Sequence, residues 1–240
     1  LKGIDNGVMD KATFVAFLQD SHDPDPNPSE RPGRWIGETG WPTQNVSNQR
    51  YGMKPGTLLE RTFEAGGVVN IFSPLSLGLK TGEYMPISGP AELPQDQSGD
   101  DARSICFDHQ PLTEQLDLLG TIKVHLRLSS DCSCGLVAAR LCDVAPEGAS
   151  TLISYGVLNL KQRNGRENLA EITPGESLDI VVRLNDTGWS LKPGHKLRLA
   201  LSSQLWPMAW PVSERATLSL DLAHCYLDLP VRKADAGGEI

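Results

Sequence analysis

The chain has 240 residues, of which 39% are hydrophobic and 22% charged, so it is long enough and apolar enough to bury the core of a globular domain. Its formal net charge of −8 argues against a nucleic acid or an anionic membrane as the main partner, because an acidic surface repels both. No apolar run approaches the roughly 20 residues that a membrane-spanning helix needs.

The first third of the sequence predicts short ordered segments joined by irregular chain. The apolar residues between 14 and 18 are compatible with either a helix or a strand. The segment from Asp20 to Gly33 is rich in Pro and Asp and therefore predicts an irregular connector. Its acidic residues lack the spacing of a calcium-binding loop, so we favour a solvated connector over a calcium site. Residues 33–42 predict a strand and a turn, and residues 57–72 predict two further strands.

The segment from Ser73 to Asp101 predicts a long loop. A loop of this length in a compact domain is usually a functional or docking element. Its end contains the densest charged cluster of the sequence, Asp100-Asp101-Ala102-Arg103, which we interpret as a turn at the entry of a strand with a local ion pair.

The rest of the chain alternates apolar and polar residues at the period of half-buried strands. The predicted strands are 103–107, 121–129, 136–144, 152–160, 178–184, 196–202 and 216–222. Two of them, 136–144 and 152–160, are more continuously apolar, as central strands covered on both faces are, and the turn at 145–148 predicts a hairpin between them. Many short strands without a convincing helix predict an all-β fold, an antiparallel jelly-roll sandwich of two sheets.

The segment from Arg183 to Pro211 has the clearest local pattern. Leu197, Leu199 and Leu201 alternate with polar residues, and a Pro193-Gly194 turn precedes them, so the segment predicts a hairpin. The Trp-Pro-rich stretch that follows has two interpretations. Trp189, Trp206 and Trp210 form a sugar-stacking platform, or, the interpretation we favour, they close the ends of the core.

The cysteines indicate neither a metal site nor a disulfide framework. They lack paired C-x-x-C spacing, their number is odd, and several lie in apolar strands, where a thiol behaves as a small hydrophobic group. They are Cys106, Cys132, Cys134, Cys142 and Cys225. We interpret them as reduced thiols of a cytoplasmic protein, and no residue pattern indicates a metal or other cofactor.

The sequence contains no catalytic motif for nucleophilic hydrolysis. It has no G-x-S-x-G elbow, no nucleotide-binding glycine loop and no H-E-x-x-H pair. The five histidines are scattered, and we interpret His125 and His195 as surface or hydrogen-bonded structural groups. No residue is assigned a catalytic role, and the chain by itself is predicted to be catalytically silent.

Three blocks of sequence identify a family. DQSGDDARSICFDHQPLTEQLDLLG, RLCDVAPEGASTLISYGVLNL and NDTGWSLKPGHKLRLALSSQLWPMAWP resemble the C-terminal domain of the cocaine esterase / X-prolyl dipeptidyl-peptidase (CocE/NonD) family of bacterial serine hydrolases. LKGIDNG at the start is similar to the segment that follows the catalytic domain in those enzymes. The resemblance implies a jelly-roll of galactose-binding-like fold that accompanies an α/β-hydrolase domain carrying the Ser-His-Asp triad.

The resemblance also sets the expected organisation of the chain. Residues 1–18 are expected to be a tail that follows the missing α/β-hydrolase domain, residues 19–232 the jelly-roll sandwich, and residues 233–240 a disordered tail. The expected partners are the hydrolase domain of the same parent chain and a small ester or amide substrate at the domain interface, with a homo-oligomer as a further possibility.

In members of the family the long early loop helps to wall the substrate pocket. The matching stretch runs from Gly78 to Pro94, and Tyr84, Met85 and Ile87 are its candidates for contacts with the substrate. The alternative function, of a different class, is a carbohydrate-binding module of jelly-roll type that uses the tryptophans.

Overall fold

The computed structural model of the chain describes residues 3, 7, 10–60, 66–83 and 93–233, and it is almost entirely β-structure. This confirms the all-β prediction. Within these residues the strands are β1 (Phe14–Asp20), β2 (Gly33–Glu38), β3 (Val46–Lys54), β4 (Thr57–Glu60), β5 (Val68–Ile71), β6 (Ile105–Asp108), β7 (Leu116–Gly120), β8 (Lys123–Ser130), β9 (Leu136–Val144), β10 (Ser150–Asn159), β11 (Leu178–Arg183), β12 (Thr187–Leu191), β13 (Lys196–Ser202), β14 (Leu218–Asp221) and β15 (Tyr226–Arg232). The short helices are α1 (Ser98–Asp101), η2 (Leu160–Gln162) and η3 (Leu222–His224).

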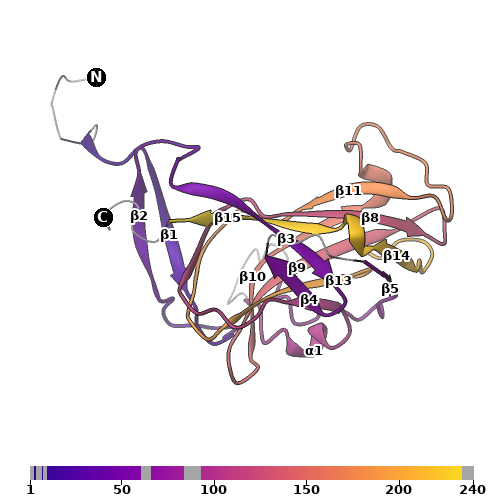
Figure 1. Cartoon of the computed structure of the whole chain (residues 1–240), viewed down its shortest axis with the longest axis horizontal. Helices are drawn as coiled ribbons and strands as arrows, with labels where there is room; N and C mark the ends of the chain where they lie inside the picture. Colours follow the sequence, from indigo (N-terminus) through magenta and orange to yellow (C-terminus); the bar gives the residue numbers. More distant parts are fainter. Residues whose placement is uncertain (1–2, 4–6, 8–9, 61–65, 84–92, 234–240) are drawn as a thin grey trace.

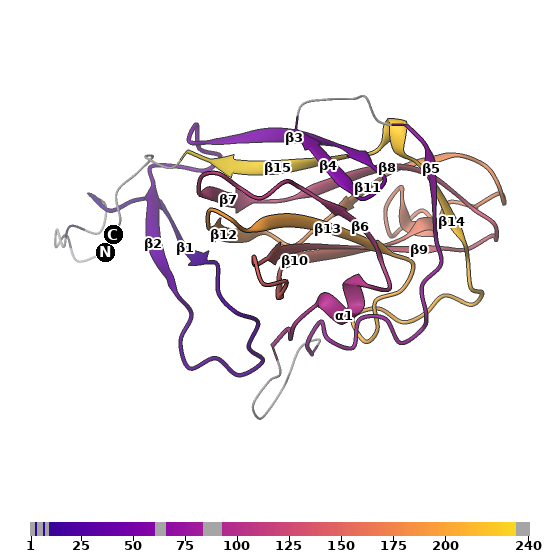
Figure 2. The ribbon, with the colours of Figure 1, turned by 60° about the horizontal axis from the view of Figure 1, so that its bottom comes forward.

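The strands form two layers (Figure 1, Figure 2). The first layer is antiparallel and has the order β10–β9–β13–β6; we call it the covered sheet because α1 and the preceding loop lie over its outer face. The second layer, which we call the open sheet, pairs β11 with β8, β8 with β15, and β15 with β3. The layers are joined through β4, which pairs with β3 and makes one parallel bridge to β6.

The open sheet continues toward one end of the molecule, where β1 and β2 stand (Figure 1). There β12 pairs with β7 on one side and, in parallel, with β1 on the other, and β1 pairs with β2. Residues 14–18, whose conformation the sequence left open, are therefore strand. The boundary expected between residues 18 and 19 falls inside β1. Of the tail at 233–240, only Lys233 lies in the described part, and its amide donates to the Asn45 carbonyl.

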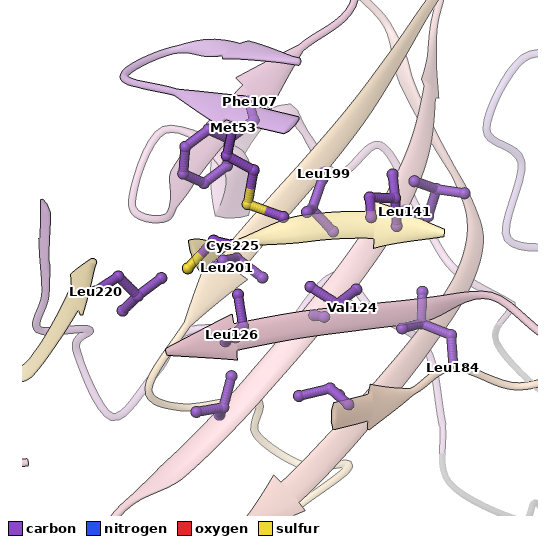
Figure 3. Packing of buried hydrophobic residues seen from close by; sticks show 14 of the residues in the cluster. Met53, Phe107, Val124, Leu126, Leu141, Leu184, Leu199, Leu201, Leu220 and Cys225 are labelled. Carbon is purple, nitrogen blue, oxygen red and sulfur yellow. The ribbon is translucent and has the colours of Figure 1, made fainter. Parts of the chain in front are cut away.

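The core fills the space between the two layers (Figure 3). Leu197, Leu199 and Leu201 of β13 are 0–1% exposed, which confirms the predicted alternation. Leu199 and Leu201 face Val124 and Leu126 of β8 (Figure 3). Strand β9 is buried along its whole length, as expected for a strand covered on both faces. The same expectation is wrong for β10, where many side chains are only half-buried, because β10 is the edge strand of its layer and has one neighbour instead of two.

The predicted hairpin around Pro193-Gly194 is also wrong. Both flanking strands exist and the turn is present, with the His195 amide donating to the Lys192 carbonyl. However, β12 pairs with β7 and β1 in one layer, whereas β13 pairs with β6 and β9 in the other. The turn is therefore a crossing between layers. The hairpin predicted at 145–148 is confirmed, since β9 and β10 pair along their length.

Candidate functional site

Two loops that are about 130 residues apart in sequence form one surface at the edge of the covered sheet. The Ser73 amide donates to the Ser203 hydroxyl, and the Ser203 amide donates to the Ser73 hydroxyl, at 3.0 and 3.1 Å. Further along, the Trp206 amide donates to the Leu77 carbonyl at 2.7 Å. The long early loop and the tryptophan-rich loop, which the sequence presented as separate features, are thus parts of the same site.

Leu77 and Leu205 anchor the two loops. Both side chains are fully buried, and they pack with Leu136 and Ala138 from the outer side of β9 into a second hydrophobic cluster. Between them the chain passes so closely that a Cβ on Gly78 would lie 2.5 Å from the Trp206 carbonyl oxygen, and Gly78 has φ +107°. Only glycine fits this position without displacing backbone.

The residues around these anchors are turned outward. Leu75 is 49% exposed, Leu79 57% and Trp210 80%, and with Trp206 and Pro211 they line a shallow hollow of about 440 Å³. We call these five residues the Trp210 patch. Contiguous exposed apolar side chains of this kind mark interaction surfaces in soluble proteins. The alternation Leu75, Leu77, Leu79 is the signal in the sequence for this arrangement.

The tryptophans have different positions. Trp189 is 2% exposed and donates its indole N–H to Asp143 at 3.0 Å, so it closes the core as predicted. The prediction is wrong for Trp210, because Leu205 takes the inward position and the chain leaves the sheet after it. Trp206 and Trp210 meet edge to face, with their planes at 69°, so the two rings do not form a common stacking platform.

A network of charges holds the end of the long loop against the covered sheet. Arg103 pairs with Asp100 at 2.5 Å, which confirms the predicted local ion pair. Asp101 is buried between two guanidinium groups, Arg140 at 2.9 Å and Arg198 at 3.2 Å. Its second carboxylate oxygen also accepts from the Ser150 hydroxyl. Burial of an ionised aspartate requires such partners, so α1 is fixed in position by them.

The candidate pocket residues Tyr84, Met85 and Ile87 lie outside the described residues. The chain on either side of that segment is described, and its two ends are held together. The Gln95 amide donates to the Lys80 carbonyl at 2.9 Å, and the Lys80 amide donates to Asp100 at 3.2 Å. Lys80 follows directly on Leu79 of the Trp210 patch, so the stem of the segment is continuous with the patch.

Among the described residues, Ser21, Asp143 and His195 bring together the residue types of a hydrolytic triad, but their geometry does not form one. Asp143 is buried and stands between the other two: His195 Nδ1 lies 2.7 Å from Oδ1, while the Ser21 hydroxyl donates to Oδ2. A catalytic base must instead bond the nucleophile directly. The cluster ties the end of β1 to β9, and this hydrogen bond confirms the structural interpretation of His195.

The cysteines are free thiols, as predicted. The environments of Cys106 and Cys142 disfavour the reactive thiolate. Burial, reinforced by the negative charge of Asp101, raises the pKa of Cys106 to about 12. Burial also raises the pKa of Cys142 well above its usual range. Among the described residues, no group of three or more His, Cys, Asp or Glu side chains is placed to hold a metal ion. In the same part of the chain no helix is long and apolar enough to cross a membrane.

The described part of the chain is thus a β-sandwich with an exposed apolar patch. Residues 6–235 match the family described as the X-Pro dipeptidyl-peptidase C-terminal non-catalytic domain, and the chain belongs to this family. The resemblance seen in the sequence is thereby confirmed.

Known proteins of this kind are longer than the chain. Cocaine esterase from Rhodococcus sp. is 24% identical over 189 residues, which are 72% of this chain and 32% of the esterase. Xaa-Pro dipeptidyl-peptidase of Streptococcus gordonii is 26% identical over 156 residues, 51% of this chain and 21% of the peptidase. The chain therefore spans a third or less of the length of these curated relatives.

Solved structures share the fold. An alpha-amino acid ester hydrolase superposes with a TM-score of 0.69 at 22% identity, covering 82% of this chain and 39% of the hydrolase. A CocE/NonD family hydrolase from Staphylococcus aureus superposes with a TM-score of 0.71 at 12% identity, covering 96% of this chain and 43% of the hydrolase. These superpositions support the β-sandwich; jelly-roll connectivity and the galactose-binding likeness stay predictions.

Proposed function

We propose that the chain is the accessory domain of a serine hydrolase and that it packs against an α/β-hydrolase domain through the Trp210 patch. The single observation that carries the proposal is the patch itself: three large apolar side chains are 49–80% exposed, on loops that Leu77, Leu205 and Asp101 hold against the sheet. A rigid apolar surface is what a domain interface requires, since little conformational entropy is lost on docking.

The segment 84–92, whose described flank at Lys80 follows directly on Leu79 of the patch, is proposed to wall the substrate pocket at that interface. A pocket between two domains gains walls and loses water when both are present. The hydrolase domain would supply a serine nucleophile, its histidine base and an oxyanion hole, and the substrate would be a small ester or amide. The free cysteines support the proposal of a reducing, cytoplasmic compartment.

The docking proposal is tested in a full-length hydrolase that contains this chain. Replacing Leu79 and Trp210 together by Ser is expected to split its single calorimetric unfolding transition into two, because the domains no longer stabilise each other. The matched control replaces Leu169 and Val181, which are 64% and 42% exposed, by Ser and is expected to leave one transition. If both double variants behave alike, the patch is not the interface. Light scattering on the same samples measures self-association.

The pocket proposal is tested separately by Tyr84→Ala in the same full-length enzyme. The expected result is a change in KM or in acyl-chain preference across a series of esters, with unchanged unfolding. Unaltered kinetics on all esters would exclude Tyr84 from the pocket. Titration with a glycan panel examines the alternative function: saturable binding that Trp210→Ser abolishes would favour a carbohydrate-binding module over a docking domain.

A further inference from the structure

A second hollow surface lies beside Trp41, which belongs to the connection between β2 and β3. Trp41 is 47% exposed; its ring stacks on Phe14, with centroids 4.6 Å apart, and lies over Gly120, where a Cβ would be 3.4 Å from the indole. Hollows of about 250 and 270 Å³ flank the indole and share Trp41, Leu119, Gly120 and Thr121. We call the two together the Trp41 groove.

One half of the groove contains two cations that face each other. Lys123 of β8 and Arg183 of β11 are direct partners in the strand register, and both line this half. Like charges directly opposite on a sheet destabilise it. Within the described part of the chain, neither side chain makes an ion pair or a hydrogen bond, so no neighbouring group there compensates for their repulsion.

The acidic register partner of Lys123 is already engaged. Asp228 of β15 is the register partner of Lys123 on its other side, but Arg50 takes both of its carboxylate oxygens, at 2.7 and 2.9 Å. The row Arg50, Asp228, Lys123 and Arg183 therefore contains three cations and one carboxylate, on a chain whose net charge is −8. An anion from outside would relieve this local excess of positive charge.

The other half of the groove is apolar along Phe14, Ala16 and Leu119, and Asp186 also lines it. The Asp186 carboxylate accepts from the Thr121 hydroxyl and would repel an anion bound at that side. The groove therefore has a direction: a cationic end at Lys123 and Arg183, which would bind an anion, and an aromatic surface at Trp41. Each half is below the roughly 300–1,000 Å³ of a pocket for drug-sized ligands, so the fitting molecule is small.

We propose that the Trp41 groove binds a small organic carboxylate, with the anionic group between Lys123 and Arg183 and a planar apolar body against the indole of Trp41. Two cations and one exposed ring face are the complement of such a molecule. The site goes beyond the proposed docking function, because it shares no lining residue with the Trp210 patch.

Titration of the 240-residue chain at low salt, followed by tryptophan fluorescence and calorimetry, tests the proposal with phenylacetate as the probe. Saturable binding is expected, weaker by at least about tenfold for phenylacetamide, which lacks the charge, and for acetate, which lacks the ring. Lys123→Gln with Arg183→Gln is expected to weaken phenylacetate binding by a similar factor without lowering Tm, since it removes a repulsion. Arg166→Gln, at an exposed cation elsewhere, is the matched control and should bind as the parent does.

Three results of the binding measurements would overturn the proposal. They are the absence of saturable phenylacetate binding, equal affinity for phenylacetamide or acetate, and the same loss of affinity in Arg166→Gln as in the double variant. A lower Tm in the double variant would show that the two cations stabilise the sheet, contrary to the repulsion on which the proposal rests.

Discussion

The outer faces of the two sheets carry similar ion pairs in opposite surroundings. On the covered sheet, Arg140 is 0% exposed and lies 2.9 Å from Asp101, beneath α1. On the open sheet, Arg127 makes a two-pronged pair with Asp179, whose side chain is 72% exposed. Removing a partner from a buried pair leaves an uncompensated charge, whereas water replaces the partner of an exposed one. The same chemistry therefore fixes a loop on one face and has little effect on the other.

The largest effect is expected from Arg140→Ala. It leaves Asp101 with Arg198 as its remaining cation in a buried position, and the free energy of unfolding should fall by about 3–5 kcal/mol. Urea denaturation followed by circular dichroism measures this change. The matched variant Arg127→Ala on the open sheet should give no resolvable change. Equal losses in the two variants would remove the distinction between the faces.

A smaller effect is expected within the Trp210 patch and its anchor. Leu77 is fully buried, so Leu77→Ala leaves a cavity and should cost about 2–3 kcal/mol, at the lower end for core leucines because its cluster is small. Leu79 lies two residues further along and is 57% exposed. Leu79→Ala should lower the free energy of unfolding by less than about 0.5 kcal/mol. Hydrogen exchange provides a second measurement. The Trp206 amide donates a hydrogen bond to the Leu77 carbonyl, so Leu77→Ala should speed exchange of this amide, and Leu79→Ala should leave its exchange rate unchanged.

The smallest effect is a pH dependence confined to the open sheet. Burial lowers the pKa of His125 below its usual 6.5, and Arg50 and Lys123 act in the same direction, while Asp228 partly opposes them. The unfolded chain therefore takes up a proton at a higher pH than the folded one, and the free energy of unfolding should fall as the pH drops from about 6.5 through the folded pKa. Denaturation curves between pH 7.5 and about 5 measure the slope attributable to His125.

His125→Gln is the control for that slope, because glutamine does not titrate. The free energy of unfolding of the parent minus that of the variant should fall as the pH drops through this window. Above about pH 7.5 it should be constant. A pH-independent difference would mean that His125 has the same pKa in both states, and that the partly open face does not perturb it.

Several strands were predictable because local pattern and final environment agree. β9 and β13 begin and end where the alternation and apolar runs placed them, since each packs a complete face on the core. Strands β3, β7, β12 and β15 were not among the predicted strands. Strand β15 contains Pro230, which lowers strand propensity, and its partners β3 and β8 come from distant parts of the sequence.

The candidate site was predicted in part. The sequence indicated the long loop and the Trp-Pro stretch, but it did not indicate that Ser73 and Ser203 join them or that Trp210 points outward. Periodicity reports which residues share a face of one element, and it contains no information about which loops meet across a sheet.

The sequence by itself determined the β-class, the family, the free thiols and the local ion pair at Asp100. Each of these follows from neighbouring residues along the chain or from sequence similarity to a known family. Only the tertiary structure decided that Pro193-Gly194 crosses between layers, that Asp101 is shared by Arg140 and Arg198, and that Lys123 faces Arg183. Those relations depend on strand pairing between distant segments, which is fixed by burial of both layers against each other.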